Sequence, residues 1–168
     1  MSTQEHKALS PKHVTCMVIT VSDTRTEETD KSGQLMKQLV GEAGHHVALY
    51  QIVKDEPAEV IAAIEAGVAH PDVQVILLNG GTGISPRDNT FEAVRGLLEK
   101  EMPGFGELFR MLSFTEDIGP AAMLSRAVAG TRGGKMIFST PGSTGAVKLA
   151  MNRLIVPELG HVVRELNR

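Results

Sequence analysis

Short apolar runs alternate with longer amphipathic stretches along most of the chain. The runs contain six to eight residues, are rich in Val, Ile and Leu, and end at polar residues or glycines. Runs of this length are typical of strands buried in a parallel sheet. The predicted strands are residues 14–21, 47–53, 73–78 and 135–140. The stretches between them predict helices over residues 30–43, 57–69, 89–100, 103–114 and 119–128.

The alternation of strands and helices predicts an α/β fold. We expect a three-layer αβα sandwich whose mostly parallel sheet carries helices on both faces. Pro57 suits the first turn of a helix, and Gly44 suits the position after one. Two helical stretches close the chain, the second opening at Pro157. A flexible polar arm over residues 1–13 is expected to precede a single domain over residues 14–168.

Composition narrows the class of protein. The 168 residues carry a net charge of −3 and a pI of about 6.1, which argues against a nucleic-acid-binding surface. Cys16 is the only cysteine, which excludes an internal disulfide and fits a reducing cytoplasm. Its apolar surroundings favour a buried small side chain over a nucleophile. With no apolar run long enough for a membrane span and no signal-peptide pattern, the sequence predicts a cytoplasmic protein without a membrane partner.

The third apolar run ends in the sequence GGTG at residues 80–83. Arg87 and Asp88 follow, and a helix is predicted to begin near residue 89. A glycine turn between a parallel strand and a helix N-terminus is where such sheets bind ligands, because free N–H groups and the helix dipole attract anions. The structural alternative is a tight turn without a ligand. Three glycines with an Arg-Asp pair exceed what a turn needs, which favours an anion-binding loop.

Polar clusters follow all four predicted strands. Because the carboxyl ends of parallel strands share one edge of a sheet, these clusters should converge there. Asp23, Asp55 and Asp88 would then repel one another unless a cation intervened, and Mg²⁺ bound together with substrate phosphates would resolve that repulsion. Each cluster alone also has a structural explanation, such as a capped turn or a surface ion pair. The clusters are Ser22-Asp23, Asp55-Glu56, residues 80–88, and Pro141-Gly142-Ser143.

Two other patterns in the sequence resemble binding motifs but do not predict a functional site. Residues 130–136, GTRGGKM, resemble a phosphate-binding loop, but Met136 stands where Ser or Thr is required and the predicted strand follows the loop. His45 and His46 would point to opposite faces of a strand, and the other four histidines are far apart in the sequence, so no zinc site is predicted. The sequence shows neither a Ser-His-Asp triad nor a Cys-His pair.

Residues 80–90, GGTGISPRDNT, resemble the GGTG-x-x-x-RD-x-T signature of the MoaB/MogA family of molybdenum cofactor biosynthesis proteins. The resemblance continues through residues 19–23, 55–56, 101–107, 123–126 and 141–143, and spans the chain from about residue 14 to residue 158. The stretch over 105–130 is more similar to the MoaB branch than to MogA. One departure is Phe91, where many members of the family have proline. Thr90, or Asn89 in a capping box with Glu92, is expected to cap the helix there.

The resemblance implies a molybdopterin-binding αβα domain with adenylyltransferase activity. Such an enzyme joins ATP and molybdopterin to give adenylylated molybdopterin and pyrophosphate, with Mg²⁺. The resemblance assigns catalysis to Asp55 and Asp88, which are also the candidate Mg²⁺ ligands. It further implies a homotrimer or homohexamer, and other molybdenum cofactor biosynthesis proteins are candidate partners. The expected substrate-binding residues are Ser22, Asp23, Gly80, Gly81, Thr82, Gly83, Arg87, Glu101, Ser125, Arg126, Pro141, Gly142 and Ser143.

Two other functions compete with this one. A non-catalytic molybdopterin carrier or scaffold would use the same loops, although the presence of Asp88 favours an enzyme. Molybdate insertion ranks lower, because the longer relatives that carry it out have additional domains. A cluster of apolar residues also supports oligomerisation, since one helical layer does not readily bury them all. These residues are Phe105, Leu108, Phe109, Met111, Leu112, Phe114, Met123 and Leu124.

Overall fold

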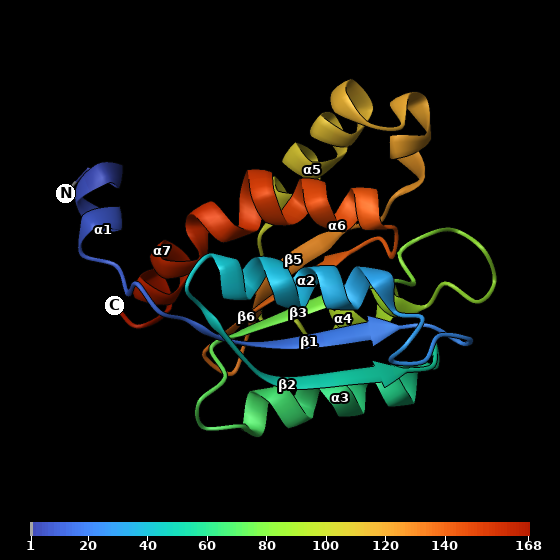
Figure 1. The fold of residues 1–168 in the computed structure, drawn as a ribbon, viewed down its shortest axis with the longest axis horizontal. Helices are drawn as coiled ribbons and strands as arrows, with labels where there is room; N and C mark the ends of the chain where they lie inside the picture. Colours follow the sequence, from blue (N-terminus) through green and yellow to red (C-terminus); the bar gives the residue numbers. More distant parts are fainter. Residues whose placement is uncertain (1) are drawn as a thin grey trace.

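The computed structural model describes residues 2–168, in which one six-stranded sheet lies between two layers of helices (Figure 1). The strand order is β2-β1-β3-β6-β5-β4. The first four of these pair in parallel, whereas β5 runs antiparallel to both of its neighbours. The predicted three-layer α/β fold is therefore confirmed. The strands are β1 (Thr15–Val21), β2 (His46–Val53), β3 (Val75–Asn79), β4 (Lys100–Glu101), β5 (Val128–Arg132) and β6 (Lys135–Thr140).

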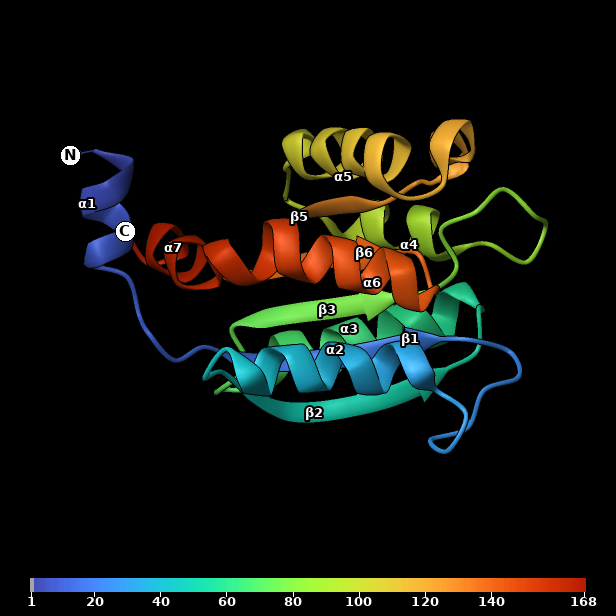
Figure 2. The same cartoon turned by 45° about the horizontal axis from the view of Figure 1, so that its top comes forward.

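The helices divide between the two faces of the sheet (Figures 1 and 2). Successive side chains of a strand point to opposite faces, so Leu77 enters one apolar core and Leu78 the other. This two-sided burial explains why the parallel strands read as continuous apolar runs. On one face lie α2 (Lys31–Glu42), α5 (Pro103–Glu116), α6 (Thr144–Ala150) and α7 (Val156–Leu166). The other face carries α3 (Pro57–Ala69) and α4 (Thr90–Leu97).

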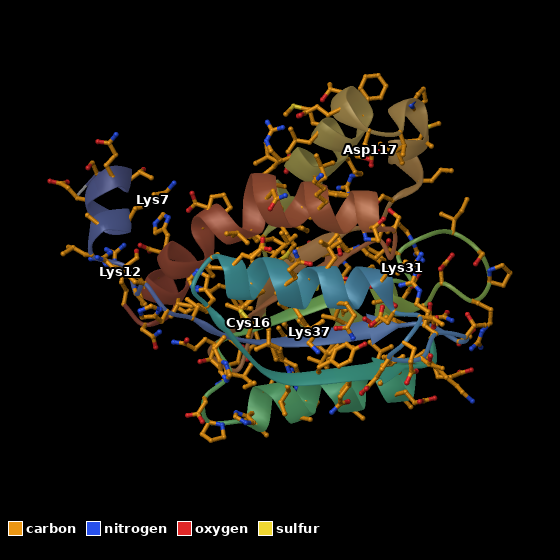
Figure 3. All side chains as sticks on the ribbon, in the orientation of Figure 1. Lys7, Lys12, Cys16, Lys31, Lys37 and Asp117 are labelled. Atoms are coloured by element: carbon orange, nitrogen blue, oxygen red, sulfur yellow. The ribbon has the colours of Figure 1, made fainter. Side chains whose placement is uncertain are left out.

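Cys16 lies in β1, in the same core as Met36 and Val40 of α2 (Figure 3). The side chain is fully buried, and burial raises the pKa of its thiol to about 12. A thiol with this pKa stays protonated at neutral pH and is a poor nucleophile. The interpretation of Cys16 as a small core residue is therefore confirmed.

The helix predicted over residues 119–128 is wrong in its second half. A 3₁₀ helix, η1 (Gly119–Leu124), is followed by strand β5, which forms a hairpin with β6. Gly133 and Gly134 close that hairpin at φ values of 55° and 78°, the left-handed region that a type I′ turn requires. The glycines that resemble a phosphate-binding loop are thus a hairpin turn.

Smaller differences concern the ends of elements. Helix α4 stops at Leu97, not residue 100, because Lys100–Glu101 pairs with β5 as strand β4. The two closing helices are continuous, since a π-helical turn, η2 (Met151–Ile155), joins α6 to α7. Pro157 still occupies the first turn of α7, as predicted.

The N-terminal segment, predicted as a flexible polar arm, contains a short helix. Residues Thr3–Ala8 form helix α1, which opens with a capping box between Ser2 and Glu5. Helix α1 packs against α7, so the two ends of the chain lie close together (Figures 1 and 2). Across the described residues 2–168, no helix combines the length and apolar character that a bilayer crossing needs.

Candidate functional site

The four strand-end clusters meet at one edge of the sheet. The Asp55 N–H donates to Asp23 Oδ1 at 3.0 Å, which joins the loops after β2 and β1. The Gly80 N–H donates to the Thr140 carbonyl at 2.9 Å, which joins β3 to β6. A Cβ built on Gly142 would lie only 3.2 Å from Gly80 Cα. The structure thus brings the polar clusters together as the strand order predicts.

The glycine loop after β3 has no room for side chains. Gly80 and Gly81 have φ values of 107° and 71°, which L-residues rarely adopt. A Cβ on Gly81 would lie 2.5 Å from Asp55 Oδ2 and closer still to Thr90 Oγ1. Gly83 has an ordinary φ, but a Cβ there would lie 2.7 Å from Asp88 Oδ2. Glycine at positions 81 and 83 therefore allows the carboxylates of Asp55 and Asp88 to approach the loop backbone.

Asp55 is buried beside this loop, with only 5% of its surface exposed. Its Oδ1 accepts from the Asn89 N–H at 3.1 Å, at the N-terminus of α4. Burial raises the pKa of the Asp55 carboxyl above its usual value, although the bond from Asn89 opposes this shift. The negative charges of Asp88 and Asp23 raise the pKa further. A carboxylate in this position is costly for the fold, which is typical of functional sites.

Asp55→Asn is therefore expected to raise the Tm at pH 7. The folded protein binds the Asp55 proton more tightly than the unfolded chain, so this carboxyl lowers stability as pH rises from its usual pKa to its raised pKa, and the loss persists above that range. Asparagine removes that charge and keeps an oxygen for the Asn89 N–H. The gain in Tm over wild type should shrink as the pH falls towards 4, as followed by thermal unfolding.

Asp23→Asn provides the matched control. The hydrogen bond from Arg87 lowers the pKa of Asp23, so its charge stabilises the fold above its usual pKa. The Asp23 variant should lose stability at pH 7, which is the opposite sign. Equal changes in Tm for the two variants would contradict the assignment of a destabilising charge to Asp55.

Asp88 shapes the far end of the loop. Its Oδ2 accepts from the Ser85 N–H at 2.9 Å and from Ser85 Oγ at 2.7 Å. Arg126 donates to the carbonyl oxygens of Gly83 and Asp88, both at 2.9 Å, and so ties the two ends of the segment 83–88 together. Arg126 also pairs with Glu92. The expected capping box at α4 is therefore wrong, because Glu92 faces Arg126 and Asn89 caps without a side-chain bond.

Arg87 joins three carboxyl-bearing loops at this edge. Two of its nitrogens donate to Asp23, at 3.0 and 2.9 Å, and the third donates to Glu56 at 2.6 Å. Arg87 does not pair with Asp88, its neighbour in the sequence, among the contacts of the described residues. Its first role in this structure is to neutralise Asp23 and Glu56, which leaves the charge of Asp88 uncompensated by Arg87.

Glu101, Ser125 and Arg126 line a cavity of about 420 Å³, and Arg126 connects this cavity to the glycine loop. Phe91 of α4 and Arg110 of α5 line the cavity too. Arg126 lies between the glycine loop and this cavity. Its guanidinium donates to a carbonyl of the loop, and the residue also lines the cavity. The sequence predicts Glu101, Ser125 and Arg126 as binding residues but misses Arg95, Glu107 and Arg110, and only the structure shows that all six line one space.

The remaining predicted residues hold the loops in place. Ser143 caps α6, accepting from the Ala146 N–H at 3.1 Å, and the Gly142 carbonyl accepts from Arg25 at 2.9 Å. Ser22 Oγ accepts from the Arg25 N–H at 3.1 Å. These contacts give Ser22 and Ser143 structural roles at the edge of the site.

Sequence reasoning misses a buried polar network beneath this edge. Arg25 donates to Ser32 at 2.5 Å, and Ser32 donates to Asn79 at 2.7 Å. Asn79 donates to Thr20 at 3.0 Å, and Thr20 donates to Asp30 at 2.7 Å. The available signals were an amide that ends an apolar strand and an arginine in the polar loop after β1. This network fixes the strand ends that carry the loops.

The donor set fits a hard divalent cation. Within residues 2–168, Asp55 Oδ2 and Asp88 Oδ1 accept no hydrogen bond, and both carboxyl groups flank the glycine loop. Asp88 also raises the pKa of Asp55 through its charge, so the two groups are electrostatically coupled. Carboxylate oxygens are the protein ligands that Mg²⁺ prefers.

Comparison with known proteins identifies the family. A family model described as a probable molybdopterin binding domain matches residues 17–161. Molybdenum cofactor biosynthesis protein B of Bacillus cereus is 61% identical over 168 residues, which cover 100% of this chain and 99% of that protein. A crystal structure of a protein with the same name superposes with a TM-score of 0.92 at 62% identity, covering 95% of this chain and 99% of the other.

A solved structure of lower sequence identity supports the same family. The tungsten cofactor synthesizing protein MoaB from Pyrococcus furiosus superposes with a TM-score of 0.84 at 36% identity, covering 95% of this chain and 100% of that one. The glycine loop and the carboxylates around it thus belong to a fold shared along nearly the whole chain. The resemblance seen in the sequence is confirmed, and the chain belongs to the MoaB/MogA family of molybdenum cofactor biosynthesis proteins.

Proposed function

We propose that this protein binds molybdopterin at the carboxyl edge of its sheet and adenylylates it with ATP, releasing pyrophosphate. Membership of the family supports a role in molybdenum cofactor biosynthesis. The observation that carries the finer proposal is the position of Asp55 and Asp88, whose carboxylates approach the glycine loop at Gly81 and at Gly83 respectively. A binding loop needs no such costly pair of charges, whereas phosphoryl transfer with a metal ion does.

The reaction needs positioning and charge neutralisation more than proton transfer. The terminal phosphate of molybdopterin is ionised at neutral pH, so one of its oxygens attacks the α-phosphorus of ATP without a strong general base. A P–O bond forms there as the bond to pyrophosphate breaks. Glycine N–H groups and the N-terminus of α4 favour phosphates at the loop. Mg²⁺, held by Asp55 and Asp88, would supply Lewis-acid stabilisation of the phosphates.

The cavity beside Arg126 offers room for the part of the substrate that extends beyond its phosphate. Its lining combines apolar surface with Glu101, Ser125 and Arg126, and such a mixture suits a flat heterocycle with polar edges. Arg126 bridges this cavity and the loop that carries Asp88. A substrate bound in the cavity would thus affect the position of Asp88 through the side chain of Arg126.

Pyrophosphate release from ATP in the presence of purified molybdopterin and Mg²⁺ tests the activity. We expect one pyrophosphate for each molybdopterin consumed, together with adenylylated molybdopterin by mass spectrometry. Tight molybdopterin binding without pyrophosphate would support a carrier and overturn the enzyme. Omission of Mg²⁺ should abolish turnover.

We also propose that the protein assembles with threefold symmetry, as a trimer or a hexamer. Of the eight apolar residues predicted to drive assembly, Phe105, Phe109 and Leu112 fill the core of the single chain. The other five are between 48% and 78% exposed and lie on α5 and η1, which stand at the edge of the molecule (Figure 2). Exposed apolar surface of this extent is typical of an interface. These five residues are Leu108, Met111, Phe114, Met123 and Leu124.

Leu108→Glu combined with Phe114→Glu is expected to give single chains of 18.0 kDa, whereas wild type sediments at three or six times that mass. Two buried charges at an interface cost more than a typical association free energy gains. Leu9→Glu, at a 63% exposed position outside α5 and η1, is the matched control and should leave the assembly intact. A wild-type mass of one chain at all concentrations would contradict the proposal.

A further inference from the structure

Three side chains of metal-ligand type meet where α1 packs against α7. His6 comes from α1, and His161 and Glu165 come from α7. One ligand atom from each lies within 4.8 Å of the other two. His6 Nδ1 is 2.7 Å from Glu165 Oε1, and His161 Nε2 is 3.7 Å from the same oxygen. The cluster thus joins the two ends of a chain whose histidines are far apart in the sequence.

The backbone brings these groups together. His161 and Glu165 are four residues apart on one helix, so they share a face of α7. A Cβ on Gly160 would overlap the carbonyl oxygen of Pro11, which shows how closely the segment after α1 lies against α7. The side chains of His6 and His161 are only 14% and 22% exposed, which limits their freedom. These side chains would therefore need little further ordering when a metal ion binds.

The surroundings of His161 resemble those of a metal-bound histidine. Its Nδ1 lies 2.8 Å from Glu158 Oε2, which favours a proton on Nδ1 and leaves Nε2 as the ligand atom facing the cluster. Lys7, which extends from α1, pairs with the other oxygen of Glu158 (Figure 3). The cluster therefore contains a second carboxylate that orients a ligand and is itself held by an ion pair.

We propose that His6, His161 and Glu165 bind a divalent transition-metal ion that fastens α1 to α7. Two imidazoles and one carboxylate suit Zn²⁺ or Co²⁺ and leave a coordination position for water. A groove of about 800 Å³ adjoins the cluster, lined by His161 and Glu165 together with apolar residues, and gives the ion access. The site lies at the end of the sheet opposite the catalytic edge, beside both chain termini (Figure 1).

This proposal goes beyond catalysis and does not depend on it. The hydrogen bond between His6 and Glu165 is the contact that the ion would replace, with both groups moving from a shared proton to a shared metal. Because neither group contacts the glycine loop, loss of the ion should leave molybdopterin binding unchanged. The site would then stabilise the terminal helices only.

Co²⁺ binding to untagged protein at pH 7.5 tests the site. Wild type should bind one Co²⁺ per chain with the visible absorption bands of a four- or five-coordinate ion, and Zn²⁺ should displace it. His161→Ala and Glu165→Gln should each weaken binding at least tenfold and remove the bands. Zn²⁺ should also raise the Tm of wild type but not of these variants.

His46→Ala is the matched control, since His46 is an exposed histidine at the start of β2. This variant should bind Co²⁺ as wild type does. His6→Ala removes the ligand from α1, and circular dichroism checks that the rest of the fold is intact. Equal Co²⁺ affinity and spectra for wild type, His6→Ala and His161→Ala would overturn the proposal, as would the absence of binding to wild type at millimolar Co²⁺.

Discussion

Asp88→Asn is expected to slow pyrophosphate formation at least about a hundredfold, while the Tm changes little. Removing one group that stabilises transition-state charge typically costs two to three orders of magnitude in rate. Asparagine keeps an oxygen that can accept the Ser85 N–H, so the loop should keep its shape. Because only the negative charge is lost, the loss should appear in kcat and in the Mg²⁺ concentration needed for turnover.

Ser85→Ala is the control for loop shape. It removes the Oγ bond to Asp88 but keeps the N–H bond and the carboxylate. Its rate should stay within about tenfold of wild type, because the carboxylate, its charge and its bond from the Ser85 N–H all remain. Near-wild-type turnover by a folded Asp88→Asn protein would exclude Asp88 as a catalytic group.

The sheet and the site edge are predictable from the sequence because their physical signals are local. Strands buried on both faces appear as apolar runs, and parallel strands send their carboxyl ends to one edge. Three features then identify the loop after β3: glycines, an Arg-Asp pair and a following helix. Strand order alone is enough to place Asp23, Asp55 and Asp88 near one another, as the structure shows.

The sequence does not reveal contacts that depend on packing between distant segments. Residues 125–128 read as the end of a helix because Ala and Arg favour helices, yet pairing with β6 makes Val128–Arg132 a strand. The pair Gly133-Gly134 is a hairpin signal that could have corrected this reading. Arg87 illustrates the same limit at the site, since its partners are Asp23 and Glu56 and not the adjacent Asp88.

The cluster of His6, His161 and Glu165 is a second contact between distant segments that the sequence does not reveal. Six histidines scattered through the sequence argue against a metal site, and spacing alone cannot show that His6 folds back onto His161. The helical segment of the N-terminal arm makes that contact possible. A sequence-level signal exists in its capping box, where Ser2 and Glu5 stand three residues apart.

Gly81→Ala is expected to reduce molybdopterin affinity more than tenfold and to lower the Tm. At φ 71° an L-residue costs about 1–2 kcal/mol even in open space. At Gly81 the new methyl group would also lie 2.5 Å from Asp55 Oδ2, in a buried position. The loop must therefore move away from Asp55, and its N–H groups would no longer point at a bound phosphate.

Two other glycines separate the causes of this effect. Gly44 has a φ of 85°, and a Cβ there would have no other atom within 4 Å, so Gly44→Ala should show the conformational cost alone and bind molybdopterin normally. Gly83→Ala has no unusual φ, but its methyl group would press on Asp88 Oδ2, so it should slow turnover with a smaller loss of stability. Isothermal titration with molybdopterin and thermal unfolding measure both quantities. Unchanged affinity in Gly81→Ala would mean that the loop is an ordinary turn and that the substrate binds elsewhere on the sheet edge.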